Sequence, residues 1–82
     1  MEEKLINIIN PSIKDLNVWV DSIKLEKEDN ETFLRIAVDA DFIIDLNTIV
    51  KVTRIINPIL DKEELDFDNY ILDVYAKPKG DK

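Results

Sequence analysis

The chain has 82 residues, enough for one small domain, with 18 acidic and 11 basic side chains and a formal charge of −7. It contains neither cysteine nor histidine, which excludes disulfides, thiolate nucleophiles, zinc sites of the Cys/His type and imidazole catalysis. No apolar run approaches the ~20 residues that span a bilayer, so we expect a cytoplasmic location and no membrane contact. The acidic charge opposes nonspecific nucleic-acid binding and favours a basic protein partner, although it also serves solubility alone.

A helix is expected over residues 2–16, because apolar side chains recur there at helical spacing. These residues are Leu5, Ile9, Ile13 and Leu16. Pro11 falls inside the pattern and removes one backbone donor, so we expect a kink or a break into two short helices. Asn17 is expected to end the helix in the left-handed conformation that glycine usually adopts there.

A β-hairpin follows, with strands over residues 18–27 and 32–39 and a polar turn between them. The apolar alternation changes phase within the first strand, which indicates a bulge near Asp21 and Ser22. The second strand places Leu34, Ile36 and Val38 on one face and Phe33, Arg35 and Ala37 on the other. Since the chain has a single glycine, asparagine and aspartate must fill the positive-φ positions of its turns.

A second helix is predicted over residues 46–60, with Asp45 or Asn47 as its N-cap and Pro58 tightening or ending its last turn. Its buried stripe should be Ile49, Val52, Ile56 and Ile59. An acidic loop over residues 61–69 leads to a strand over residues 70–76. The element order α-β-β-α-β predicts an α+β fold, in which two helices pack on one face of an antiparallel or mixed three-stranded sheet.

Several of these segments, in this order, resemble the N-terminal domain of RimP, the bacterial ribosome maturation factor. In that family a helix carries a proline, here Pro11, and ends in a cap that is usually glycine and is Asn17 here. The family strand LRIYID is matched by residues 34–39, LRIAVD, and the Leu-Asp end of the second helix by residues 60–61. Residues 70–80, YILDVYAKPKG, match a family strand that ends in Ser-Ser-Pro-Gly, although both serines are replaced.

The resemblance implies a RimP N-terminal-like domain over residues 1–76. Residues 77–82 would begin a linker to a C-terminal barrel domain, which this chain lacks. RimP proteins assist late maturation of the small (30S) ribosomal subunit by binding the immature particle and a basic ribosomal protein, and a contact with ribosomal RNA is compatible with this role. The resemblance implies no catalysis, cofactor or metal. Since no Ser-His-Asp set or glycine-rich phosphate loop occurs, we expect that the protein is not an enzyme. We also expect it to be a monomer.

Three aspartates around the connector after the second strand are the first candidate site: Asp39, Asp41 and Asp45. They are candidates for docking a basic partner or an RNA-associated Mg²⁺. Turn and cap chemistry explains the same residues, because aspartate satisfies nearby backbone donors, and we favour this structural interpretation. The acidic residues of the loop over 61–68 are treated in the same way, as a solvated loop rather than a docking site.

The second candidate site is the altered family signature with its neighbours: Tyr75, Lys77, Pro78, Lys79 and Gly80. Its lysines and backbone donors suit a phosphate contact, and a plain linker is the equal alternative. Trp19 is a candidate partner anchor, or else a cover for the sheet face that carries no helix. Two other functions stay open. One alternative is an acidic adaptor domain. The other, with less support, is a KH-like RNA-binding module, because the GXXG loop of that family does not occur in this sequence.

Overall fold

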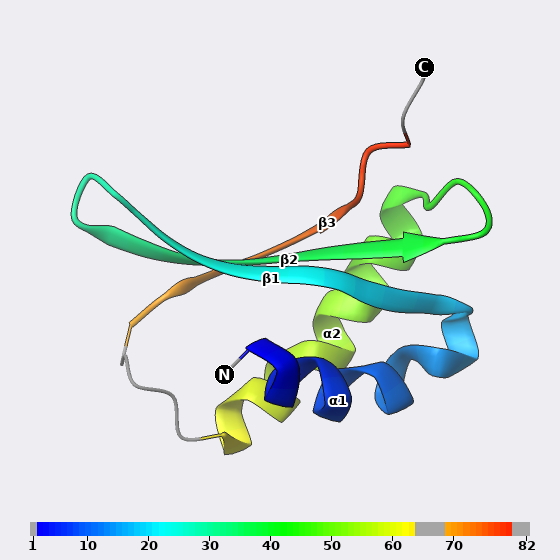
Figure 1. The fold of residues 1–82 in the computed structure, drawn as a ribbon, viewed down its shortest axis with the longest axis horizontal. Coiled ribbons are helices and arrows are strands. Elements are labelled where there is room, and N and C mark those ends of the chain that lie inside the picture. The colour runs from blue at the N-terminus through cyan, green and yellow to red at the C-terminus, as the bar shows by residue number, and fades with distance from the viewer. Residues whose placement is uncertain (1, 64–68, 80–82) are drawn as a thin grey trace.

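The structure is a computed structural model of the chain and describes residues 2–63 and 69–79. Its elements are α1 (Glu2–Ile13), a 3₁₀ turn η1 (Lys14–Leu16), β1 (Val18–Glu28), β2 (Glu31–Ala40), α2 (Leu46–Lys62) and β3 (Ile71–Ala76). Figure 1 shows the three strands as one twisted sheet with both helices on the same side of it. The α+β fold with the order α-β-β-α-β is therefore confirmed.

The sheet is mixed, with β2 in the middle. β1 pairs with β2 antiparallel, through the hairpin, and the register shifts between Val20 and Ser22, where the sequence predicts a bulge. β3 pairs with β2 in the parallel direction, with Ile36 opposite Val74. Helix α2 makes the parallel pairing possible, because it returns the chain to the end of the sheet where β2 begins.

The core lies between the sheet and the two helices. Among the described residues, the nine largest fully buried side chains come in equal numbers from α1, β2 and α2: Leu5, Ile9, Ile13, Leu34, Ile36, Val38, Val52, Ile56 and Leu60. The predicted inner face of β2 is thus confirmed. The predicted stripe of α2 is partly wrong: Leu60 belongs to it, whereas Ile49 and Ile59 are half-buried and pack against its margin.

Two of the three prolines, Pro11 and Pro58, lie inside helices. α1 runs through Pro11 without a break and ends at Ile13, and η1 continues the chain to Leu16, so the change of helix type comes after the proline and not at it, where a break was expected. Pro58 does not end α2, which continues to Lys62. Both Arg54 and Pro58 are exposed, so the carbonyl group that Pro58 leaves without a donor lies on the solvent side of the helix. Water can satisfy that group, and the helix continues.

Positive φ angles occur at Asn17 (61°), Asp29 (51°) and Asn30 (69°) within the described residues. This confirms that asparagine and aspartate replace glycine in the turns. Asn17 caps η1, and its backbone N–H donates to the Lys14 carbonyl at 2.9 Å. Asp29 and Asn30 form a two-residue hairpin turn of the type that needs positive φ at both positions, so the turn is shorter than predicted.

The left-handed conformation of Asn17 gives a first testable prediction. Asn17→Ala is expected to lower the free energy of unfolding by about 1 kcal/mol, because a Cβ atom without a polar group is disfavoured at this φ. Asn17→Gly removes that restriction and should leave stability equal or slightly higher. Urea unfolding of the two variants measures the difference, and an equal loss in both would contradict the conformational explanation.

Candidate partner-binding surface

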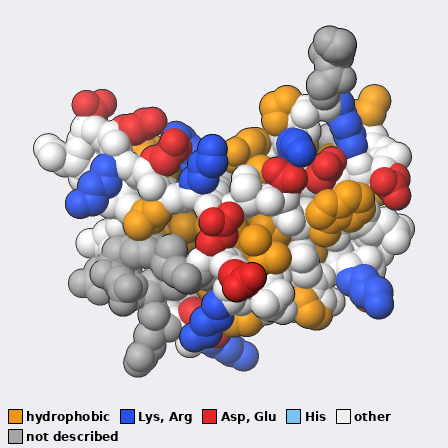
Figure 2. Space-filling view, viewed as in Figure 1, with side chains coloured by type: hydrophobic (Ala, Val, Ile, Leu, Met, Phe, Trp, Pro, Cys, Tyr) orange, Lys and Arg blue, Asp and Glu red, His pale blue; other side chains and the backbone are white. Residues whose placement is uncertain are grey.

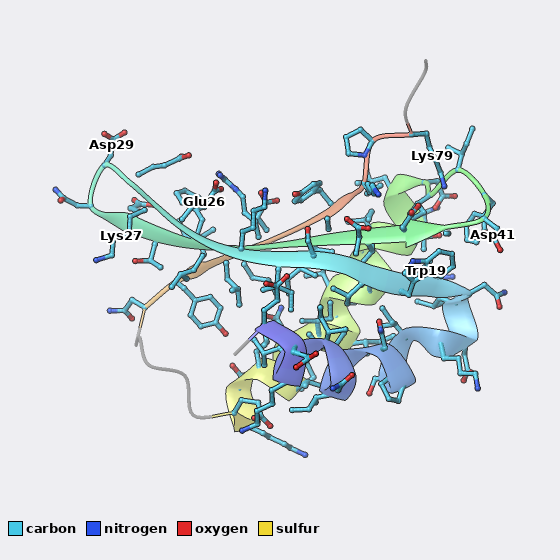
Figure 3. All side chains as sticks on the ribbon, viewed as in Figure 1. Trp19, Glu26, Lys27, Asp29, Asp41 and Lys79 are labelled. Atoms are coloured by element: carbon cyan, nitrogen blue, oxygen red, sulfur yellow. The ribbon has the colours of Figure 1, made fainter. Side chains whose placement is uncertain are left out.

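Most of the predicted site residues gather at one end of the sheet. They are Trp19, Asp39, Asp41, Lys77 and Lys79. Because β2 and β3 run parallel, their carboxyl ends lie together, and the antiparallel β1 begins at the same end. Figure 3 shows the labelled members of this set on one side, opposite the tip of the β1–β2 hairpin.

Asp39 joins the carboxyl ends of β2 and β3. Its Oδ1 accepts hydrogen bonds from the Lys79 ammonium group at 3.0 Å and from the Ala40 backbone N–H at 2.8 Å. The hydrogen bond from Lys79, and then that from Ala40, lower the pKa of the Asp39 carboxyl. Lys79 also donates to the Ala40 carbonyl oxygen. The segment after β3 is therefore attached to the end of β2.

Lys77 holds the same segment to β1. Its backbone N–H donates to the Val38 carbonyl at 2.7 Å, which extends the parallel pairing by one residue. Its ammonium group lies 3.2 Å from Asp21 Oδ1, at the bulge of β1. Both lysines considered for a phosphate contact are thus paired with carboxylates of the sheet, and a phosphate would have to compete with those ion pairs. Pro78, between them, is exposed, and Gly80 lies outside the described residues.

The Asp39 carboxylate gives a prediction about acid stability. Because its pKa is lower in the folded chain, its stabilising effect is fully present above the unfolded-state pKa of about 4 and is lost as the pH falls through the lowered folded-state value. Asp39→Asn should therefore lose less stability than the wild type between pH 7 and 3. Lys79→Met, which removes the largest cause of the shift, should do the same. Urea midpoints across this pH range provide the measurement, and identical acid responses in all three proteins would contradict it.

Asp45, the third predicted aspartate, has a structural role at the start of α2. Asp45 is the N-cap of α2, and its carboxylate accepts a hydrogen bond from the Thr48 N–H at 2.8 Å, which lowers its pKa. This agrees with the structural interpretation of Asp45 and with one of the two predicted N-caps.

Asp41 is exposed and lines a shallow hollow of about 610 Å³ together with Trp19 and residues of α1 and η1. Within residues 2–63 and 69–79, no three potential metal ligands lie together, so the predicted aspartates do not form a metal-binding group there.

Exposed apolar side chains adjoin these polar residues, and the sequence analysis did not single them out as a site. They come from the β2–α2 connector and the first turns of α2: Phe42, Ile43, Leu46 and Val50. Ile43 is 85% exposed and Leu46 76% exposed. We call these four residues, with Trp19, Asp39, Asp41, Lys77 and Lys79, the carboxyl-end surface. Figure 2 shows hydrophobic side chains exposed among charged ones at this end. The sequence signal that could have pointed to this site is the run of apolar residues that begins at Phe42, inside a connector.

The open face of the sheet is organised around Arg35. Its guanidinium contacts Glu26 at 2.5 Å, Glu28 at 3.3 Å and Asp73 at 3.1 Å, and these carboxylates raise its pKa. The same group lies 4.7 Å from the centroid of the Phe33 ring, within the range of a cation–π contact. A half-buried Tyr75 also belongs to this sheet region, opposite the buried Ala37 of β2. The open face is thus covered largely by its own side chains.

The fold and this surface define the chain as a small acidic α+β domain with one mixed sheet and helices on a single face. The model of the RimP N-terminal domain family matches residues 8–76, which is most of the chain. The chain therefore belongs to the RimP N-terminal domain family, the family of a ribosome maturation factor. The resemblance seen in the order of the strand and helix motifs is confirmed. Among the described residues, no helix is long and apolar enough to cross a membrane.

Proposed function

We propose that this chain assists maturation of the small ribosomal subunit as a monomeric, cytoplasmic and non-enzymatic binding domain. The family membership supports a role in ribosome maturation. The carboxyl-end surface supports binding, because exposed Ile43 and Leu46 beside acidic side chains have the composition of an interface with an apolar centre and a polar margin. This juxtaposition is the observation that carries the proposal.

A basic ribosomal protein on the immature particle is the contact that we infer. The chain carries a formal charge of −7, so a basic surface would be attracted over distances of about 10 Å at moderate salt, whereas RNA phosphates would be repelled. The ion pairs of Lys77 and Lys79 also favour a protein partner over RNA, since each ammonium group is already paired with a carboxylate. The proposed partner is accordingly a protein surface that combines lysine and arginine with apolar side chains.

Co-sedimentation of the purified chain with immature and mature small subunits, at low and moderate salt, tests the proposal. Selective sedimentation with immature particles, weakened by salt, is the expected result. A matched chain with a folded core but altered charge, such as Asp41→Lys, should bind more weakly, because it reverses one exposed charge of the surface. Absence of selective binding would overturn the proposal and leave an acidic adaptor domain as the better description.

A further inference from the structure

The two edges of the sheet differ in how their backbone groups are satisfied. On the outer edge of β1, the Val20 N–H donates to Asn10 Oδ1 at 2.7 Å and the Ile23 N–H donates to Glu2 Oε2 at 3.2 Å. Both acceptors are side chains of α1. The bulge after Val20 interrupts the same edge. Bulges and covering helices are devices that block the addition of a further strand, so the β1 edge is closed from its start to Ile23.

The outer edge of β3 carries no such device within the described residues. Lys77 donates its N–H to β2, and since backbone groups alternate in direction along a strand, those of Leu72, Val74 and Ala76 point away from β2. No hydrogen bond joins these three amides to another described residue, and β3 is the last strand of the sheet. β3 has neither proline, glycine nor lysine, and its one charged residue, Asp73, is paired with Arg35 on the open face. The outward backbone groups of β3 can therefore pair with an added strand.

The charges near this edge select the occupant. On the open face Arg35 is shared by three carboxylates, Asp73 on β3 and Glu26 and Glu28 on β1, and Lys24 lies opposite Arg35 in the register. This group of five side chains keeps a net negative charge, and the Asp73 carboxylate is the member on β3 itself. On the other face, Leu72 and Val74 pack against the apolar core. A strand added here would place alternate side chains on the face of the Asp73 carboxylate and on the face of Leu72 and Val74. Lysine or arginine alternating with valine, isoleucine or leucine satisfies both faces.

We propose that the free edge of β3 binds an extended basic segment of a partner protein as a fourth strand. This rests on the proposed function, and it states how a basic ribosomal protein would be held. Main-chain hydrogen bonds would supply affinity, and the alternating side chains would supply selectivity. A second copy of the chain fits less well, because each copy carries a formal charge of −7 and would bring its own Asp73 carboxylate to the same edge.

The probe is a peptide of about ten residues in which valine and lysine alternate, titrated into the full chain at low salt. Amide hydrogen exchange reads the site, because the Val74 N–H faces outward whereas the Asp73 N–H already faces β2. The expected result is new protection at Leu72 and Val74 with little change at Asp73. No binding, or binding without protection of the outward amides, would overturn the proposal.

Two methylated peptides test whether the contact is a strand. N-methylation of every valine, or of every lysine, removes the donors along one edge of an extended peptide and leaves the other edge intact. Loss of binding in only one of the two peptides is expected, because only one edge faces β3. Equal binding by all three peptides would overturn the added strand and show attraction of charge alone. Formation of dimers in place of peptide binding would also overturn it.

On the protein side, Val74→Pro removes an outward donor while the donors that face β2 remain. Val74→Ala loses similar packing and keeps the N–H, so it is the matched control. Peptide affinity should fall at least tenfold in the proline variant relative to the alanine variant, with both shown to be folded by circular dichroism. Equal affinities would overturn the proposal. If the chain sediments with immature subunits but does not bind the peptide, only the strand-addition proposal is contradicted. If it binds the peptide but does not sediment with the subunits, the proposed function is contradicted.

Discussion

Ile36→Ala and Ile56→Ala are each expected to lower the free energy of unfolding by about 2–5 kcal/mol. Ile36 lies in the central strand and Ile56 in the middle of α2, and both side chains are 0% exposed. Each truncation removes buried apolar atoms and leaves a cavity between the sheet and a helix. Since small domains are stable by only about 5–15 kcal/mol, either change removes a large part of the total. Urea unfolding at neutral pH measures it.

Ile43→Ala is the matched control, because it makes the same chemical change at a side chain that is 85% exposed. Its effect on the free energy of unfolding should stay within about 0.5 kcal/mol. Three variants with the same loss of stability would contradict the placement of the core. A loss confined to Ile43→Ala would contradict it more strongly, since it would give the connector the role assigned to β2 and α2.

Ile43→Ser and Leu46→Ser are expected to weaken binding to the immature small subunit by at least about tenfold each, with stability nearly unchanged. Both side chains are exposed in the free chain, so their burial by a partner would contribute to affinity and not to folding. Quantitative co-sedimentation at a fixed salt concentration measures the change. An unchanged affinity in both variants would remove the apolar part of the carboxyl-end surface from the interface.

Leu25→Ser provides the control for that experiment. Leu25 is also an exposed leucine, and it lies in β1 toward the hairpin turn, away from the carboxyl ends of β2 and β3. Its replacement should leave affinity within about twofold of the wild type, because surface changes outside an interface have small effects. A loss equal to that of Leu46→Ser would show that general hydrophobicity, and not a defined surface, determines binding.

The elements of this fold could be predicted because their signals are local. The alternation of Leu34, Ile36 and Val38 shows a strand with one buried face, and the spacing of Val52 and Ile56 shows a helix. The end of α2 was harder to place, since α2 continues through Pro58 to Lys62 and the carbonyl group that loses its donor lies on the exposed side of the helix. Sequence patterns do not report that exposure.

The carboxyl-end surface could be predicted only in part. Asp39 and Lys79 were both candidates, but their ion pair joins residues forty positions apart and depends on the parallel register of β2 and β3. Composition cannot supply that register. The exposure of Ile43 was missed for a related reason: an apolar residue in a connector is expected to be buried, and only the three-dimensional path of the chain leaves it in solvent.

The parallel position of β3 also sets an order of events for folding. β1 and β2 meet through a two-residue turn, and hairpins of this kind form in roughly 1–10 μs. β3 can pair with β2 only after the chain has travelled along the whole of α2, so its contacts are non-local and close the largest loop in the sheet. We therefore expect β3 to be the last strand to join the sheet, and until it does the edge of β2 that faces away from β1 has no partner strand.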